Sequence, residues 1–198
     1  VSNLDGTKKS QIFDSPFNEW LSYWPSADMV TLTTKPSFVS PGHMYTINTK
    51  TKSLDRILGY IYGLTTLTSP NGKLVLYGDS SLTLSLYDIT KKTSTLLGVN
   101  TLPEKCVWGK VSATIYCAVP QTANPGQYPD TWYQGEVSFV DQIWKIDVLS
   151  GTTTMISDPS TLRGGEDIDG IKLRLDANER YLLLVNKKDS FLWKLELN

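Results

Sequence analysis

Short runs in which apolar and polar residues alternate dominate this chain, and helix-like spacing of apolar residues is nearly absent. The runs are rich in β-branched and aromatic residues, which suit the half-buried surface of a pleated sheet. Gly, Pro, Asn, Asp and Ser separate them, as expected of turns. Clear examples are residues 73–77, 114–119 and 181–185. The pattern predicts an all-β protein.

A two-part unit recurs along the chain, and this repeat decides the expected architecture. The first part is a hairpin, clearest at residues 67–74, 108–115 and 175–182 and looser at 23–30. The second part is a strand that ends in a polar residue, followed by a turn and a Thr- or Ser-rich strand. Its polar marker residues lie 40, 59 and 49 positions apart and are Asn48, Asp88, Asp147 and Glu196. Propeller blades repeat at roughly 40–50 residues.

We therefore expect a single β-propeller domain, residues 1–198, made of four consecutive four-stranded blades. The blades are expected at about residues 14–58, 59–98, 99–157 and 158–198. A β-sandwich is the alternative, but it does not account for the recurring strand order. The chain begins with a strand-like segment, residues 8–13, and ends on a third strand. Either this segment pairs with residues 191–197 and closes a four-bladed ring, or the chain is part of a larger propeller.

One hairpin carries a resemblance to known repeats. Its sequence, T-S-P-N-G-K-L at residues 68–74, resembles the S-P-D-G-K hairpin of WD-like propellers, which occur in TolB and beside the hydrolase domain of prolyl oligopeptidases. Asn71 stands where Asp is usual, and both residues suit that turn. Residues 102–108 and 128–135 are similar to segments of bacterial WD-like propeller proteins. The resemblance implies a fold and carries no activity with it.

Charge and hydropathy exclude several classes of partner. The net charge of −1 gives no electrostatic reason to expect nucleic acid or an anionic membrane surface. No apolar run approaches the roughly 18 residues of a membrane helix, so a membrane would be reached only through segments outside this chain. The chain begins Val1-Ser2-Asn3, without Met, so upstream residues are expected to have been removed or left out.

The residue inventory offers little for catalysis. The chain has one histidine, His43, no G-x-S-x-G elbow, no phosphate-binding loop and no zinc-ligand spacing. We expect no enzyme activity, no cofactor and no metal. The enzymatic alternative is a hydrolase acting on glycans with Asp130, Glu166 and Asp169. That chemistry needs two carboxyl groups about 5–9.5 Å apart in a cleft.

The two cysteines are expected to face each other across a hairpin. If the hairpin is centred between Val111 and Ser112, Trp108 pairs with Ile115 and Cys106 pairs with Cys117. Directly opposite residues come close enough for a disulfide. Two buried thiols packed as small apolar groups are the alternative. A disulfide would favour an extracytoplasmic or cell-envelope location.

An insertion at residues 120–137 breaks the repeat between the second and third strands of the third blade. Long loops inside compact domains are often functional. Its aromatic residues either bind a ligand or fold back to plug the neighbouring blade. The inter-blade loops are expected on the same face. The candidate binding residues are Tyr128, Asp130, Trp132 and Tyr133 of the insertion, with Glu166, Asp167 and Asp169 of the inter-blade loop 162–170 and Phe38 and His43 of the segment 34–43. Glu166, Asp167 and Asp169 could also offer oxygens to Ca²⁺, although an acidic, Gly-rich turn is usually just solvated.

The preferred functional hypothesis is a non-catalytic binding or scaffold propeller that recognises a protein or a glycan through this loop face. The glycan hydrolase is one alternative. The other is a purely structural module of a larger envelope protein.

Overall fold

The computed structural model describes residues 1–162 and 164–197, and nearly all of its regular structure is antiparallel β-sheet. Blade 1 contains β1 (Trp20–Ser26), β2 (Met29–Thr34), β3 (Pro41–Asn48) and β4 (Leu54–Tyr62). Blade 2 contains β5 (Thr65–Thr68), β6 (Leu74–Gly78), β7 (Thr83–Asp88) and β8 (Thr93–Asn100). Blade 3 contains β9 (Cys106–Trp108), β10 (Thr114–Pro120), β11 (Asp141–Asp147) and β12 (Thr153–Ser157). Blade 4 contains β13 (Gly170–Leu175), β14 (Tyr181–Asn186) and β15 (Leu192–Glu196).

Within residues 1–162 and 164–197, three helical segments of about one turn each interrupt the strands. They are η1 (Pro103–Lys105), α1 (Asp130–Tyr133) and η2 (Pro159–Thr161). No helix in the described part of the chain is long and apolar enough to cross a membrane.

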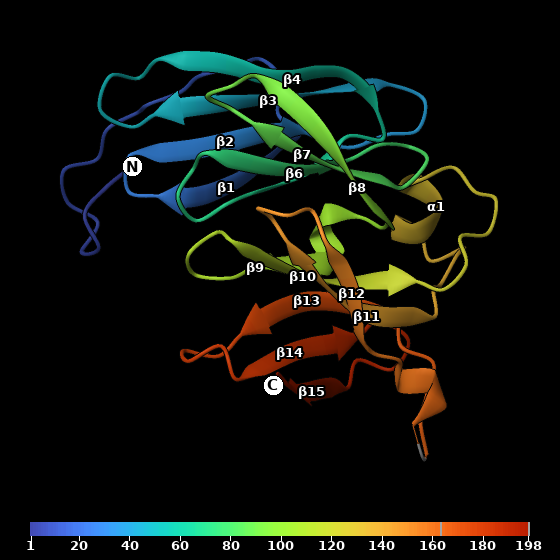
Figure 1. Ribbon diagram of the computed structural model, residues 1–198. Helices are drawn as coiled ribbons and strands as arrows, with labels where there is room; N and C mark the ends of the chain where they lie inside the picture. Colours follow the sequence, from blue (N-terminus) through green and yellow to red (C-terminus); the bar gives the residue numbers. More distant parts are fainter. Residues whose placement is uncertain (163, 198) are drawn as a thin grey trace.

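The strands of every blade follow one another in sequence order, each paired with the next. The blades succeed one another through the molecule, from β1–β4 to β13–β15 (Figure 1). A pocket of about 420 Å³ is lined by residues from all four blades, including Tyr23, Leu67, Trp108 and Arg174. The four sheets are therefore arranged around a common axis, which confirms the expected four-bladed β-propeller architecture.

Apolar side chains fill each interface between successive blades. Met44 and Leu58 of blade 1 meet Val75 of blade 2. The next two interfaces are larger. Blades 2 and 3 join through Leu76, Leu84, Leu97, Val99, Cys106, Trp108, Ile115 and Cys117, and blades 3 and 4 through Tyr116, Ala118, Ile143, Ile168, Leu173, Leu182 and Leu184. Because a blade has two apolar faces, each interface buries one face of each of the two blades that form it.

The polar residues that mark the repeat have a common structural role. The side-chain oxygen of Asn48 accepts hydrogen bonds from the backbone N–H groups two and three residues later. Asp88 and Asp147 do the same in the following blades. Each of these three markers thus holds the turn between the third and fourth strands of its blade.

The expected closure by the N-terminal segment is wrong. Residues 8–13 form no strand and have no ladder with β15 among the described residues. Ile12 and Phe13 instead cover the outer face of blade 1, where they pack on Val30, Leu32 and Ile47. That face is apolar, and its strands follow the segment closely in the sequence. The segment can therefore be buried there with only a small entropic cost of loop closure. Blade 4 contains three strands, β13–β15, in the described part of the chain.

The expected cysteine pair is confirmed. Trp108 pairs with Ile115 and Cys106 with Cys117 across β9 and β10. Cys106 and Cys117 form a disulfide with a Cα–Cα distance of 4.1 Å, and both side chains are buried between blades 2 and 3.

Reduction of this disulfide should lower the free energy of unfolding by about 3 kcal/mol, the chain-entropy estimate for a loop of this size. Urea unfolding with and without reductant measures the effect. The double variant Cys106→Ala/Cys117→Ala is the control and should unfold identically in both buffers. Equal stability of the oxidised and reduced wild-type protein would contradict the prediction.

Candidate functional site

The insertion between β10 and β11 folds back onto the propeller. Tyr128, Trp132 and Phe139 are buried in one cluster with Leu82 and Leu102. The segment approaches the blade 1–blade 2 connection so closely that a Cβ on Gly63 would lie 2.8 Å from the Tyr128 carbonyl oxygen. Tyr128 and Trp132 of the insertion therefore pack into the fold. Of the two residues that the plug interpretation concerns, Trp132 is buried and Tyr133 is 40% exposed.

A buried ion cluster holds the insertion in place. Lys105 is fully buried, and its ammonium contacts the carboxylates of Asp141, at 2.8 Å, and Asp169. Asp169 also accepts a 2.9 Å hydrogen bond from the Trp132 indole. The Lys187 ammonium lies 4.1 Å from the centre of the Trp132 ring and donates to the Trp132 carbonyl. The inter-blade loop 162–170 thus contacts the insertion, as expected, but the contact is made by the buried side chains of Asp169 and Trp132.

The two aspartates of the cluster differ in their affinity for protons. Burial alone would raise the pKa of Asp169, but the charge of Lys105 and hydrogen bonds from Lys105, Trp132 and Phe139 outweigh it and lower that pKa. Burial dominates at Asp141 and raises its pKa despite the contact with Lys105. One oxygen of Asp141, Oδ1, is buried with no hydrogen-bond partner among the described residues.

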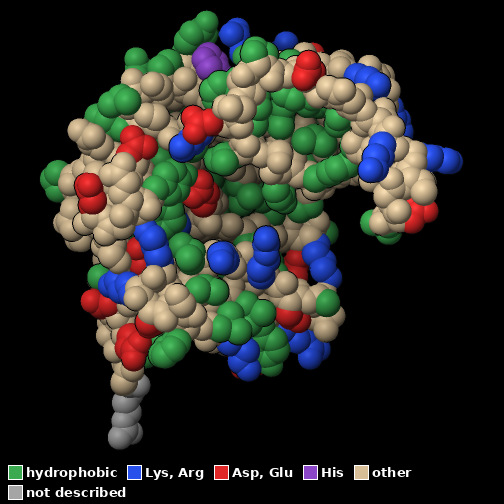
Figure 2. Space-filling model, turned by 180° about the vertical axis from the view of Figure 1, so that it is seen from behind, with side chains coloured by type: hydrophobic (Ala, Val, Ile, Leu, Met, Phe, Trp, Pro, Cys, Tyr) green, Lys and Arg blue, Asp and Glu red, His purple; other side chains and the backbone are tan. Residues whose placement is uncertain are grey.

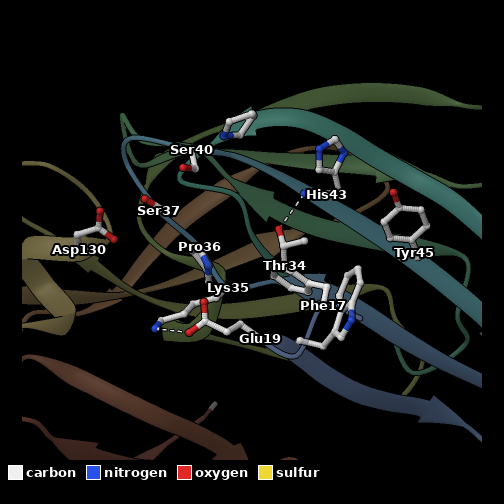
Figure 3. A pocket seen from close by; sticks show the side chains of 12 residues that line it. Phe17, Glu19, Thr34, Lys35, Pro36, Ser37, Ser40, His43, Tyr45 and Asp130 are labelled. Carbon is white, nitrogen blue, oxygen red and sulfur yellow. Dashed lines mark hydrogen bonds and ion pairs between the residues drawn. The ribbon is translucent and has the colours of Figure 1, made fainter. Parts of the chain in front are cut away.

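Asp130 is the first residue of α1, the helix that the buried cluster holds through Trp132. Its Oδ2 accepts a 2.9 Å hydrogen bond from the backbone N–H of Phe38 in the β2–β3 loop. Between them opens a pocket of about 640 Å³ (Figure 3), called here the blade 1 pocket. Its lining is Phe17, Glu19, Trp20, Thr34, Lys35, Pro36, Ser37, Ser40, Pro41, His43, Tyr45 and Asp130.

One wall of the blade 1 pocket is aromatic. The rings of Phe17 and Trp20 meet edge to face at 4.9 Å, and Trp20 meets Tyr45 in the same way at 5.8 Å. His43 continues the row at 6.4 Å from Tyr45. His43 and Tyr45 lie two residues apart on β3, so their side chains point to the same face of the sheet.

The opposite wall is polar and charged. Lys35 and Glu19 form a 2.9 Å ion pair beneath Ser37 and Asp130 (Figure 3). Thr34 accepts a hydrogen bond from the His43 backbone N–H at 3.0 Å. No hydrogen bond within the described part of the chain uses Oδ1 of Asp130, which leaves that carboxylate oxygen able to accept one.

A second, more apolar depression of about 400 Å³ adjoins the first across the Lys35–Glu19 pair. It is lined additionally by Leu21, Glu104 and Tyr133. The Tyr133 hydroxyl donates a hydrogen bond to Glu104, and burial raises the pKa of that carboxyl. Tyr133 thus lies at the surface while its neighbour Trp132 is only 4% exposed.

The residues predicted from the sequence separate into three groups. Asp130 and His43 line the blade 1 pocket, Phe38 binds Asp130 through its backbone N–H, and Tyr133 lies beside the pocket. Tyr128, Trp132 and Asp169 are buried. Glu166 and Asp167 are exposed on another part of blade 4.

This separation bears on the two acidic-site hypotheses. Asp130 lines the blade 1 pocket, Glu166 lines a depression on blade 4, and Asp169 is buried on Lys105, whereas a glycosidase needs two carboxyl groups in one cleft. Asp167 pairs with Lys188 at 3.9 Å, and Asp169 pairs with Lys105. The described residues hold no group of three potential metal ligands.

Sequence reasoning missed most of the aromatic wall, namely Phe17, Trp20 and Tyr45, and the Lys35–Glu19 pair. Tyr45 could have been predicted from the sequence, because it lies two residues after His43 and alternate residues of a strand share one face. Phe17 and Trp20 come from the segment before β1, whose path along blade 1 no local pattern reveals.

The comparisons with known proteins support the fold. No family model and no curated protein sequence matches the chain. Among solved structures, the tricorn protease superposes with a TM-score of 0.57 at 10% identity, over 83% of this chain and 15% of that chain. An auxiliary nutrient binding protein from Bacteroides thetaiotaomicron gives 0.58 at 9% identity, over 91% and 38%. The computationally designed Ika4 protein gives 0.54 at 10% identity, over 96% and 99%. The chain thus spans well under half of the two natural proteins.

Trp132→Ala should lower the free energy of unfolding by about 3–5 kcal/mol, because it empties a buried site and leaves Asp169 without the indole donor. Tyr133→Ala, at a neighbouring residue that is 40% exposed, should cost far less. Urea denaturation of both variants measures the difference. Equal losses would show that the insertion is not anchored through Trp132.

The buried cluster should make stability depend on pH in acid. Because the pKa of Asp169 is lowered by folding, its contribution is complete above the unfolded value of about 3.9 and is lost as pH falls through the folded value. The stability difference between wild type and Asp169→Asn should therefore shrink as pH falls below about 4. Urea titrations from pH 7 to pH 3 test this, and a constant difference would contradict it.

Proposed function

We propose that this protein is a non-catalytic binding module of the propeller class, and that its ligand is a glycan held in the blade 1 pocket. The single observation that carries the proposal is the pairing of an aromatic wall, Phe17–Trp20–Tyr45, with a polar wall of Lys35, Ser37 and Asp130. The pocket volume falls in the range of small-molecule sites, which is roughly 300–1,000 Å³.

The two walls suit the two kinds of surface that a sugar presents. The C–H face of a sugar ring is apolar and gains by packing on an aromatic ring, which is large and rigid. The hydroxyl groups at its edge need donors and acceptors, which Lys35 and Asp130 supply. The Lys35 ammonium is already paired with Glu19, and the carboxylate of Asp130 is also in the lining, so the pocket presents no isolated cation. A neutral saccharide therefore fits it better than a phosphate or a nucleotide.

An extracytoplasmic location is part of this proposal, and so is a kinship with WD-like or TolB-type propellers. The Cys106–Cys117 disulfide supports the location, because disulfides persist mainly in oxidising compartments. The T-S-P-N-G-K-L hairpin supports the kinship. Ser69 and Asn71 both accept backbone N–H groups of that turn, and Gly72 adopts φ +69°, as this kind of hairpin requires.

A glycan array probed with the 198-residue protein tests the proposal, followed by calorimetry on any saccharide retained. Tyr45→Ala should weaken binding about tenfold, the value expected for the loss of one stacked ring, and Asp130→Asn should weaken it further by removing a charged acceptor. Tyr62→Ala is the matched control, since Tyr62 is an exposed tyrosine of the same blade outside the pocket.

The outcomes separate the alternatives. Binding that is lost in Tyr45→Ala and kept in Tyr62→Ala supports the glycan site. Binding that is insensitive to Tyr45 places the ligand elsewhere. Absence of any retained saccharide overturns the glycan assignment and favours a structural role, and release of reducing ends from a bound saccharide would restore the hydrolase alternative.

A further inference from the structure

The blade 1 pocket continues past the Lys35–Glu19 ion pair into the second depression, called here the Tyr133 depression. The pocket of about 640 Å³ and the depression of about 400 Å³ share Glu19, Trp20, Lys35 and Pro36 as lining residues. Each hollow is by itself large enough for a small molecule, since such sites measure roughly 300–1,000 Å³. The two hollows therefore form adjoining compartments with a common boundary.

The chain's single histidine, His43, lines the blade 1 pocket and is visible on the face opposite to the view of Figure 1 (Figure 2). That face is hollowed, and hydrophobic side chains gather in the hollow beside acidic and basic ones. The molecule thus presents apolar and charged groups together on the side that carries His43.

The boundary between the two compartments is an exposed ion pair that keeps bonding capacity. The Lys35 ammonium donates to Oε1 of Glu19 at 2.9 Å, and the two side chains are 62% and 56% exposed. An ammonium group has three donors, and a carboxylate accepts through both oxygens. Exposed pairs contribute little to stability, so a ligand can bond to the remaining atoms without a large loss. A ligand that crosses the boundary therefore finds a donor and an acceptor there.

Tyr133 gives the depression an aromatic wall whose orientation is fixed. Its backbone N–H donates to the Pro129 carbonyl at 2.9 Å, and its hydroxyl donates to Glu104. Its ring lies 5.6 Å from the ring of the buried Trp132, yet Tyr133 itself is 40% exposed. Because the ring is held in place before a ligand arrives, binding costs little side-chain entropy.

The depression adds few groups to those of the boundary. Leu21 is apolar and 47% exposed. Glu104 accepts the Tyr133 hydroxyl through Oε1, and no other hydrogen bond to this carboxylate forms within the described part of the chain. The depression therefore combines an apolar surface with one remaining acceptor at Glu104 and with the Lys35 donor at its border.

We propose that the Tyr133 depression binds the acetamido group of an N-acetylhexosamine unit, and that the adjoining unit of the same saccharide occupies the blade 1 pocket. This inference rests on the glycan function proposed above and names the class of glycan. The acetamido methyl group packs on Leu21 and the Tyr133 ring. Its N–H donates to Glu104, and its carbonyl oxygen accepts from Lys35.

Other substituents match the depression less well. A hydroxyl group buried against Leu21 and the Tyr133 ring has no partner there, and an unpaired buried polar group costs free energy. A protonated amine can approach Glu104 but gives the apolar wall no methyl contact. A purely apolar acyl chain would cover Lys35 and Glu19 without bonding to them. The acetamido group supplies both kinds of contact.

Calorimetric titration of the 198-residue protein with three saccharides tests the proposal. Diacetylchitobiose carries the acetamido groups, cellobiose has the same linkage with hydroxyl groups in their place, and N-acetylglucosamine is the single unit. Diacetylchitobiose should bind at least about tenfold more tightly than cellobiose, because it buries a methyl group and adds a hydrogen bond. It should exceed N-acetylglucosamine by a similar factor of about ten, since the monosaccharide fills only one compartment.

A variant and its matched control assign the preference to the Tyr133 depression. Leu21→Ser removes apolar surface from this depression alone, because Leu21 does not line the blade 1 pocket. It should reduce the preference for diacetylchitobiose over cellobiose about fourfold, the value of one methyl contact. The control is Leu54→Ser, which should leave the preference unchanged. Leu54 belongs to the same blade, is 46% exposed and lines neither compartment.

Equal affinity for diacetylchitobiose and cellobiose overturns the proposal, and so does equal affinity for diacetylchitobiose and N-acetylglucosamine. A preference that Leu54→Ser lowers as much as Leu21→Ser overturns it too, as does failure of both disaccharides to bind. The glycan function is judged separately. It stands if any saccharide binds in a way that depends on Tyr45, and it falls if the array retains none.

Discussion

Packing between sheets that are apolar on both faces is the constraint on which this molecule depends. A four-stranded antiparallel sheet with two apolar faces cannot be stable alone, and here each blade covers one face of the next. The interior interfaces use aliphatic residues from both partners, as at the boundary between blades 2 and 3. Among the described residues no apolar cluster joins blade 1 to blade 4, and the remaining apolar face of blade 1 is covered by other means. Ile12 and Phe13 do this for blade 1.

The buried cluster around Lys105 meets a second requirement, the fixing of a long insertion. Burial of three charged groups costs free energy, and an ion pair in the interior is weak evidence for stability. The cluster nonetheless joins four segments of the chain, η1, the insertion, β11 and the loop before β13. The hydrogen bond from the Trp132 indole to Asp169 favours one position of α1 over others. Asp130 at the start of α1 is placed at the mouth of the blade 1 pocket as a result.

The fold could be predicted because its signals are local and repeated. Period-two alternation and the spacing of Asn48, Asp88 and Asp147 reflect strand geometry and turn chemistry, which act over a few residues. The pairing of Cys106 with Cys117 followed from one hairpin register. The position of residues 8–13 could not be predicted in this way, because two apolar surfaces competed for them. The alternation of that segment fits a strand as well as it fits an irregular cover. The outcome depends on the apolar face of blade 1 formed by Val30, Leu32 and Ile47, which the segment buries.

The candidate site was only half predictable, for a related reason. An aromatic residue in a long loop can bind a ligand or fill a void, and the sequence carries no sign of which void exists. Trp132 and Tyr133 are adjacent and chemically similar, yet one is buried on Asp169 and the other lies at the surface beside Glu104. The difference arises because α1 presents successive residues in different directions while Lys105, some 27 positions earlier, fixes which direction is inward. The blade 1 pocket follows from that choice, since the same turn that buries Trp132 brings Asp130 to Phe38.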